Sequence, residues 1–221
     1  RMFSKICPEI IEFKARHMNN AKANGFVDGK TKNYRYDAVK FCHKVYALTH
    51  CALSNPSDIL YWIDADTIFF KPITNPFLDQ LLPKGYYTCY LGRRDKHSET
   101  GFMGFDLQHN SSIDFMEFWK NIYDQDMIFD LPEWHDSFVY DELRKYFEAK
   151  DVIKSFDIRK DYEDDHHPFI NSPLGGFMDH LIGDHRKESG CSFASDLRTT
   201  RKELYWQLVP YMPEEFVVNN V

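Results

Sequence analysis

The sequence lacks a long apolar run, a signal-like start and a positive net charge. No apolar stretch approaches the ~20 residues that a helix needs to cross a bilayer. The opening residues, RMFSKICPEI, contain no apolar segment typical of a signal peptide. The formal charge of −7 argues against broad nucleic-acid binding, which needs a basic face. We therefore expect a cytoplasmic protein, or one held peripherally at a membrane, without a transmembrane segment.

The cysteines lack any regular spacing. The five of them lie at positions 7, 42, 51, 89 and 191, and no C-x-x-C pair occurs. An odd and dispersed set is typical of buried thiols in a reduced compartment, and it argues against a disulfide framework or a zinc site.

Apolar and aromatic residues, at 43% and 16% of the chain, are sufficient for a substantial core. Hydrophobic periodicity predicts helices over 8–25, 34–53, 77–82, 111–123, 136–150 and 199–208, and strands over 59–63, 67–73, 86–92, 101–107 and 152–158. Because strands alternate with helices, we expect an α/β fold with a mixed, mainly parallel sheet flanked by helices.

The chain length fits one catalytic domain over 1–221, with 196–221 as a C-terminal helical extension. Nucleotide-binding α/β domains usually open with a strand, whereas this sequence opens with a predicted helix. We therefore expect that the first strand or strands are missing before residue 1. Residues 161–195 are rich in Gly, Pro, His and Asp, which predicts a functional loop.

Two carboxylates stand at the end of the most apolar segment, ILYWIDADTIFF. In an extended chain Asp64 and Asp66 share one face, roughly 6.6 Å apart at ~3.3 Å per residue. Like charges at the edge of a dry core repel each other unless a cation neutralises them. One carboxylate can hold Mg²⁺ or Mn²⁺ while the other bonds a ribose hydroxyl or a metal-bound water. An acidic turn without a ligand is the alternative, and the flanking apolar strands favour the metal site.

The segment YRYDAVKFCHKVYAL, followed by ILYWIDADTIFFKPI, resembles the central part of metal-dependent glycosyltransferases of the GT-A fold, whose sheet is Rossmann-related. In that family a helix with an Arg near its start precedes a strand that ends in the D-x-D motif. The resemblance is strong over 34–73 and diffuse from there to about 190. It implies that Asp64 and Asp66 hold Mn²⁺ or Mg²⁺ on the diphosphate of a nucleotide sugar. We expect a UDP-sugar donor and a saccharide or other hydroxyl acceptor.

The same resemblance places residues of the preceding helix near the donor. It implies that Arg35 and Asp37 lie near the nucleotide, and that Lys40 or Lys44 fixes the helix against the carboxylates. A solvated helix face is the alternative for the two lysines.

A second informative stretch is FMDHLIGDHRKESG. Some retaining glycosyltransferases carry H-x-x-G-x-x-K near the C-terminus, where the His completes the metal shell and the Lys contacts the diphosphate. This sequence offers His180, Gly183 and Arg186, with Lys187 one position late. Either cation can offset the charge of a leaving diphosphate. His185 competes with His180 as the metal ligand, and a polar surface loop is the alternative.

Two further carboxylates are candidates for catalysis. Glu99 precedes a Thr-Gly pair in the region that shapes the sugar pocket of the family. Asp136 follows Trp134 and His135 at the start of a predicted helix, where it is either a general base or an N-cap. An inverting reaction requires Asp136 as base. In a retaining reaction, which the His-Gly-cation stretch favours, a phosphate oxygen takes that role and Glu99 or Asp136 steadies the sugar.

Two other functions fit parts of the sequence. Haloacid-dehalogenase-like phosphatases also end a strand in D-x-D, but their motif continues differently from the Thr67-Ile68 found here. A non-catalytic sugar- or nucleotide-binding relative is the other alternative. The acidic and histidine-rich run 164–167 is interpreted as a solvated loop, because adjacent residues rarely converge on one ion.

Overall fold

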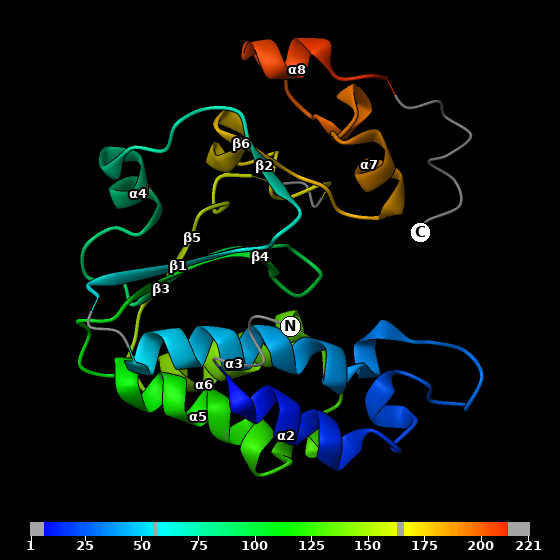
Figure 1. Cartoon of the computed structure of the whole chain (residues 1–221). Helices are drawn as coiled ribbons and strands as arrows, with labels where there is room; N and C mark the ends of the chain where they lie inside the picture. Colours follow the sequence, from blue (N-terminus) through cyan, green and yellow to red (C-terminus); the bar gives the residue numbers. More distant parts are fainter. Residues whose placement is uncertain (1–6, 55–56, 163–165, 212–221) are drawn as a thin grey trace. The chain divides into compact units, whose positions relative to one another are not determined.

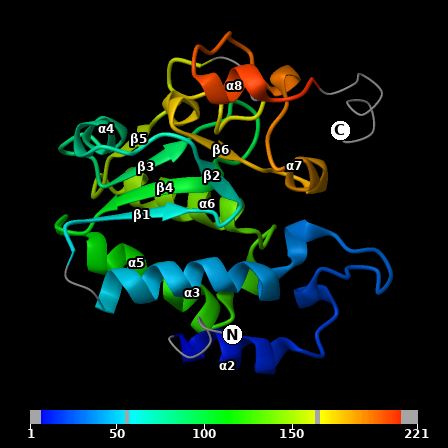
Figure 2. The same cartoon turned by 45° about the horizontal axis from the view of Figure 1, so that its top comes forward.

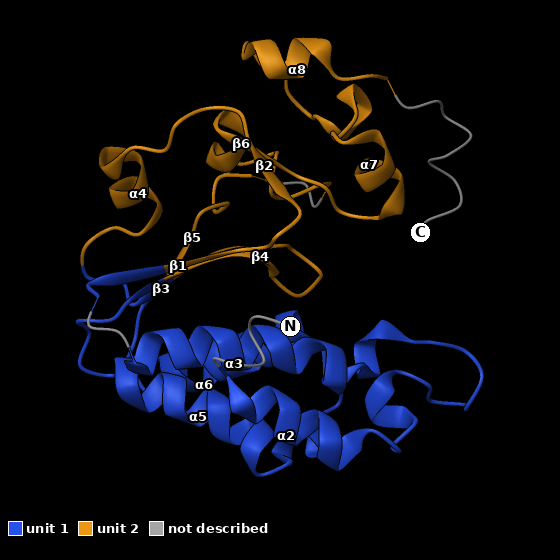
Figure 3. Cartoon of the chain, viewed as in Figure 1, with its two compact units in different colours: residues 1–60, 85–88, 105–155 blue, residues 61–84, 89–104, 156–221 orange. Residues whose placement is uncertain are grey.

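The computed structural model describes residues 7–54, 57–162 and 166–211, and these form two compact units. Unit 1 comprises 1–60, 85–88 and 105–155, and unit 2 comprises 61–84, 89–104 and 156–221 (Figure 3). The prediction of one catalytic domain over 1–221 stays a prediction.

Unit 1 is built around helices that pack against one another (Figure 1). They are α2 (Pro8–His17), α3 (Ala38–Ser54), α5 (Ser112–Asp124) and α6 (Asp136–Ala149), with the 3-10 turns η1 (Lys22–Asn24), η2 (Tyr34–Tyr36) and η3 (Met127–Asp130). In α3, residues buried at helical spacing include Cys42, Val45, Tyr46 and Thr49. Aromatic rings from several helices meet in the core, as where Tyr46 packs edge-on to Tyr123.

The first helix ends earlier than the periodicity predicts. Its last residue is His17, because the side-chain amide of Asn24 donates to the carbonyls of His17 and Asn20 at 3.0 and 2.8 Å and so turns the chain. Gly25 then adopts a left-handed φ of 88°, which favours glycine.

The larger sheet has four strands in the order β1-β4-β3-β5 (Figure 2). Their bounds are β1 (Ile59–Ile63), β3 (Thr88–Leu91), β4 (Glu99–Asp106) and β5 (Ser155–Asp157). The expectation of a mainly parallel sheet is wrong, because the sheet is mostly antiparallel with one parallel pair. Only seven residues, 92–98, join β3 to β4, and a connection this short makes a hairpin and leaves no room for a crossover helix.

The smaller sheet lies in unit 2 and pairs two segments that are distant in the sequence. Strand β2 (Thr67–Phe69) runs antiparallel to β6 (Met178–His180), with Thr67 opposite His180 and Phe69 opposite Met178. Other elements of unit 2 are α4 (Asn75–Leu81), η4 (Pro173–Gly176), α7 (Asp184–Ser189), η5 (Ala194–Asp196) and α8 (Leu204–Leu208). The predicted loop over 161–195 therefore contains a strand and a helix, so the loop prediction is wrong there.

None of the five cysteines forms a disulfide. Cys7, Cys42 and Cys89 are buried as predicted, whereas Cys51 and Cys191 are only half-buried. Within the described ranges, no helix has both the length and the apolar composition that a bilayer crossing requires.

Candidate functional site

Backbone hydrogen bonds hold the two aspartates of the D-x-D motif, which lie in unit 2 between β1 and β2. Asp64 follows β1, and its N–H donates to the carbonyl of Gly101 in β4 at 2.9 Å. The carbonyl of Asp66 accepts from the N–H of Leu181 at 2.9 Å, directly after β6. The main chain of each aspartate is therefore tied to another segment, at β4 for Asp64 and directly after β6 for Asp66.

The pairing of β2 with β6 brings His180 to these carboxylates. Its Nε2 lies 3.1 Å from Oδ1 of Asp66 and 3.9 Å from Oδ2 of Asp64. One ligand atom from each of the three side chains lies within 4.8 Å of the other two. We call Asp64, Asp66 and His180 the acid–imidazole cluster. The sequence predicted these three residues as metal ligands, and the structure brings them together.

The His180 ring is buried against Phe169, with ring centroids 4.9 Å apart. A side chain at Gly101 would collide with this ring, since an added Cβ would lie 2.5 Å from its Cε1. The ring's Nδ1 is buried and has no hydrogen-bond partner among the described residues. Its polar contacts therefore run through Nε2, the nitrogen that faces the carboxylates.

Lys187 completes the charged surroundings of the cluster. Its Nζ lies 2.9 Å from Oδ2 of Asp66, and its side chain is 49% exposed. The hydrogen bond from His180, and then the one from Lys187, holds the pKa of Asp66 well below its usual value. The same contact raises the pKa of Lys187. Asp66 is therefore ionised at neutral pH, as a metal ligand must be.

The structure distinguishes the two cations of the second motif. Arg186 forms a bidentate ion pair with the buried Asp196 and donates to the carbonyl of Ile182, so it ties α7 to η5. Lys187, in contrast, points to the cluster. Gly183 precedes α7 with a φ of 85°, a left-handed conformation that only glycine adopts readily.

Glu99 belongs to the same unit as the cluster. Its Oε1 accepts from the N–H of Gly101 at 3.0 Å, and its Oε2 lies 3.8 Å from a guanidinium nitrogen of Arg93. Glu99 is therefore bonded to the backbone of Gly101, the residue whose lack of a side chain makes room for the His180 ring.

Asp136 lies in unit 1 and has a different environment. Its Oδ2 is 2.5 Å from Nζ of Lys44, and both side chains are almost fully buried. The residue that caps α6 is His135, whose Nδ1 accepts from the N–H of Phe138, so the interpretation of Asp136 as the N-cap is wrong. Trp134 is only 3% exposed and offers no face for a sugar.

Arg35 and Asp37 also lie in unit 1. Arg35 pairs with Glu133 at 2.8 Å. Asp37 is buried, accepts from the N–H of Lys40 at the start of α3, and pairs with Lys32 at 2.8 Å. Both residues thus have charged partners within unit 1. Their position near a nucleotide stays a prediction.

The histidine-rich run 164–167 is only partly described. Asp164 and Asp165 lie outside the described residues. His167 is buried and its Nε2 lies 3.2 Å from Oγ of Ser192, so the interpretation as a solvated loop is wrong for this residue.

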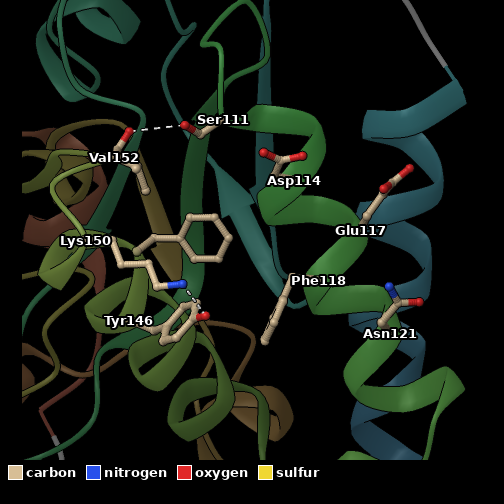
Figure 4. A pocket seen from close by; sticks show the side chains of 9 residues that line it. Ser111, Asp114, Glu117, Phe118, Asn121, Tyr146, Lys150 and Val152 are labelled. Atoms are coloured by element: carbon tan, nitrogen blue, oxygen red, sulfur yellow. Dashed lines mark hydrogen bonds between the residues drawn. The ribbon is translucent and has the colours of Figure 1, made fainter.

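Unit 1 also contains a groove of about 450 Å³ between α5 and the end of α6 (Figure 4). It is lined by Ser111, Asp114, Glu117, Phe118, Asn121, Tyr146, Phe147, Lys150 and Val152. The rings of Phe118 and Tyr146 stack with centroids 5.5 Å apart. Its carboxylates, Asp114 and Glu117, belong to no three-residue ligand group within the described ranges. The acid–imidazole cluster is therefore the stronger candidate for a chemical site.

The donor set of the cluster fits a small divalent cation. Two carboxylates and one imidazole are ligands that Mn²⁺ accepts, and Mg²⁺ accepts the carboxylates. The carboxylates are 26% and 30% exposed, so positions remain open to a ligand from solvent. A cation bound at Asp66 would have to share or replace the contact with Lys187.

Comparisons of this chain with protein-family models, curated proteins and solved structures give no significant match.

Proposed function

We propose that this protein is a divalent-metal-dependent glycosyltransferase, which moves a sugar from a nucleotide diphosphate to a hydroxyl group. The observation that carries the proposal is the convergence of the acid–imidazole cluster, with ligand atoms within 4.8 Å of one another. Support also comes from the likeness of residues 34–73 to GT-A glycosyltransferases and from the position of the D-x-D motif between two strands.

In this proposal Asp64, Asp66 and His180 hold Mn²⁺ or Mg²⁺. A bound divalent cation supplies Lewis-acid stabilisation of the charge on a leaving diphosphate. The backbone bonds from Asp64 to Gly101 and from Leu181 to Asp66 fix the main chain of both aspartates before any ligand arrives. This preorganisation lowers the entropic cost of binding.

Lys187 is the protein's own cation for the diphosphate. Because its side chain is 49% exposed, its ammonium group can turn from Asp66 to a phosphate oxygen without a large desolvation cost. Arg186 is unsuited to this role because its guanidinium is engaged by Asp196.

The surroundings of the candidate catalytic carboxylates favour a retaining reaction. A general base needs an accessible carboxylate oxygen, whereas Oδ2 of the nearly buried Asp136 lies 2.5 Å from the ammonium nitrogen of Lys44. Glu99 shares a unit with the cluster, so it is our candidate for the carboxylate that steadies the reacting sugar. Arg35 and Asp37 remain the proposed nucleotide contacts on the family likeness alone.

The finer parts of the proposal concern the partners and the compartment. We propose a UDP-sugar as donor and a saccharide as acceptor, on the strength of the family likeness. The five cysteines, none of which forms a disulfide, support a reducing compartment such as the cytoplasm.

Thermal unfolding with Mn²⁺ and UDP, separately and together, tests the proposal. A ligand present well above its dissociation constant stabilises a protein by about 3–4 kcal/mol, and we expect the largest shift with both ligands present. Asp66→Asn should abolish the Mn²⁺-dependent part. Asp79→Asn is the matched control, because it makes the same change on an exposed carboxylate of α4. A shift that survives undiminished in Asp66→Asn would contradict the metal site.

One observation favours a second function. In this structure Asp66 already forms an ion pair with Lys187 and a hydrogen bond with His180, as a metal-free site would require. The alternative is a sugar- or nucleotide-binding protein without catalysis. Calorimetry separates the two, because UDP binding that is independent of Mn²⁺ and unaccompanied by sugar transfer would support the alternative.

A further inference from the structure

One side chain near the C-terminal end of the described chain contacts the residue directly after β2 and the middle residue of β6. The ring of Tyr205, in α8, stacks on Phe70 with centroids 4.3 Å apart and planes 8° from parallel. Its hydroxyl donates to Oδ2 of Asp179 at 2.7 Å. Phe70 directly follows β2, and Asp179 is the middle residue of β6.

Asp179 is a fully buried carboxylate that depends on hydrogen-bond donors. Besides Tyr205, the N–H and the hydroxyl of Ser192 donate to it at 2.6 Å each. An unsatisfied buried carboxylate is costly, so these donors hold Asp179 in one place. Because side chains alternate along a strand, fixing Asp179 on one face also fixes the next residue, His180, on the other.

The helix that carries Tyr205 is itself anchored in unit 2. Trp206 is 4% exposed, and its Nε1 donates to the carbonyl of Gly175 at 2.6 Å. After the helix, the carbonyl of Pro210 accepts from the N–H of Ala194 at 2.9 Å. Two independent contacts therefore keep α8 in its place.

We infer that α8 is a clasp that positions the acid–imidazole cluster, and that Tyr205 is the positioning residue through which it acts. This inference rests on the proposed function. Strands β2 and β6 have three residues each, and an isolated pair of this size is marginally stable. Asp66 precedes the first strand and His180 ends the second. Support from outside the ladder is therefore needed to keep the two ligands at a fixed separation.

Tyr205→Phe tests this inference because it removes the hydroxyl and keeps the stacked ring. We expect the affinity for Mn²⁺, measured by calorimetry on the full chain, to fall about tenfold, as for other residues that orient a metal ligand. The midpoint of thermal unfolding should change little. Tyr211→Phe is the matched control, since it removes the same hydroxyl from a side chain that is 71% exposed, and it should bind Mn²⁺ like the unmodified protein.

A second variant removes both contacts of the Tyr205 side chain, the stacking on Phe70 and the hydrogen bond to Asp179. Tyr205→Ala should bind Mn²⁺ more weakly than Tyr205→Phe. If Tyr205→Phe keeps full affinity while Tyr205→Ala merely unfolds at a lower temperature, the side chain is structural and the clasp is refuted. If the unmodified protein binds no Mn²⁺, the metal site of the proposed function and this inference fail together.

Discussion

Two aspartate–lysine pairs, one in each unit, differ in their access to solvent. In unit 1, Asp136 and Lys44 are 2.5 Å apart, with side chains 10% and 11% exposed. In unit 2, Asp66 and Lys187 are 2.9 Å apart, with side chains 30% and 49% exposed. The chemical groups are the same in both pairs. If one charge of the first pair is removed, the other stays buried, whereas either group of the second pair can bond to water instead.

This difference favours a structural role for the first pair and agrees with the proposed binding role of the second. A buried ion pair is costly to break, because each partner would remain as an uncompensated charge. An exposed pair contributes little to stability and can open when a better ligand arrives. We therefore expect changes in unit 1 to act on folding, and changes in unit 2 to act on ligand binding.

The largest expected effect follows from Lys44→Met. It removes the ammonium group beside the buried carboxylate of Asp136 and should lower the free energy of unfolding by about 3–5 kcal/mol, measured by urea denaturation. Lys40→Met, on an exposed position of the same helix, should change it by less than about 0.5 kcal/mol. Equal losses in the two variants would remove the distinction between buried and exposed pairs.

An intermediate effect on stability is expected from Gly101→Ala. This change disturbs His180, which contacts Asp66, without changing a charge. The added Cβ would lie 2.5 Å from His180, so the ring must shift. We expect a loss of about 1–3 kcal/mol of stability, together with loss of Mn²⁺ binding by calorimetry. Gly176→Ala is the control, because its Cβ would meet nothing closer than 3.3 Å. Full Mn²⁺ affinity in Gly101→Ala would show that the position of His180 is unimportant.

The smallest effect on stability is expected from Lys187→Met. Loss of this exposed pair should cost at most about 1 kcal/mol at neutral pH, and high salt should shrink the cost. Without the competing ammonium, Mn²⁺ alone should bind more tightly, while the added stabilisation by UDP should fall. A cost as large as that of Lys44→Met would contradict the comparison.

The pH dependence of this variant gives a further check. The pKa of Asp66 is lowered in the folded protein by His180 first and Lys187 second. The stability that it contributes is therefore present above the unfolded-state pKa of about 3.9 and is lost as the pH falls toward the lower folded-state pKa. The difference between Lys187→Met and the unmodified protein should accordingly disappear in acid.

The sequence predicted the parts of the site that depend on local pattern. A run of apolar residues ended by two carboxylates indicated a strand with an acidic end, and β1, Asp64 and Asp66 follow that pattern. The spacing of His180 and Gly183 pointed to the second half of the site. Which cation reaches the carboxylates was left open, since only the course of α7 directs Lys187 to Asp66 and Arg186 to Asp196.

Other features depend on contacts between distant segments. Strand β6 has three residues, Met-Asp-His, and so short a segment has no detectable period. The partner of Asp136 lies in another helix, so no spacing rule identifies it. The prediction of a mainly parallel sheet was an avoidable error, because the short polar segment 92–98 indicates a hairpin.

The register that sets Thr67 opposite His180 also has a consequence for how the protein matures. During translation every strand of the four-stranded sheet leaves the ribosome before β6 does. A nascent chain therefore carries Asp64 and Asp66 for some time before it has His180, and the proposed metal site can be completed only after β6 has emerged.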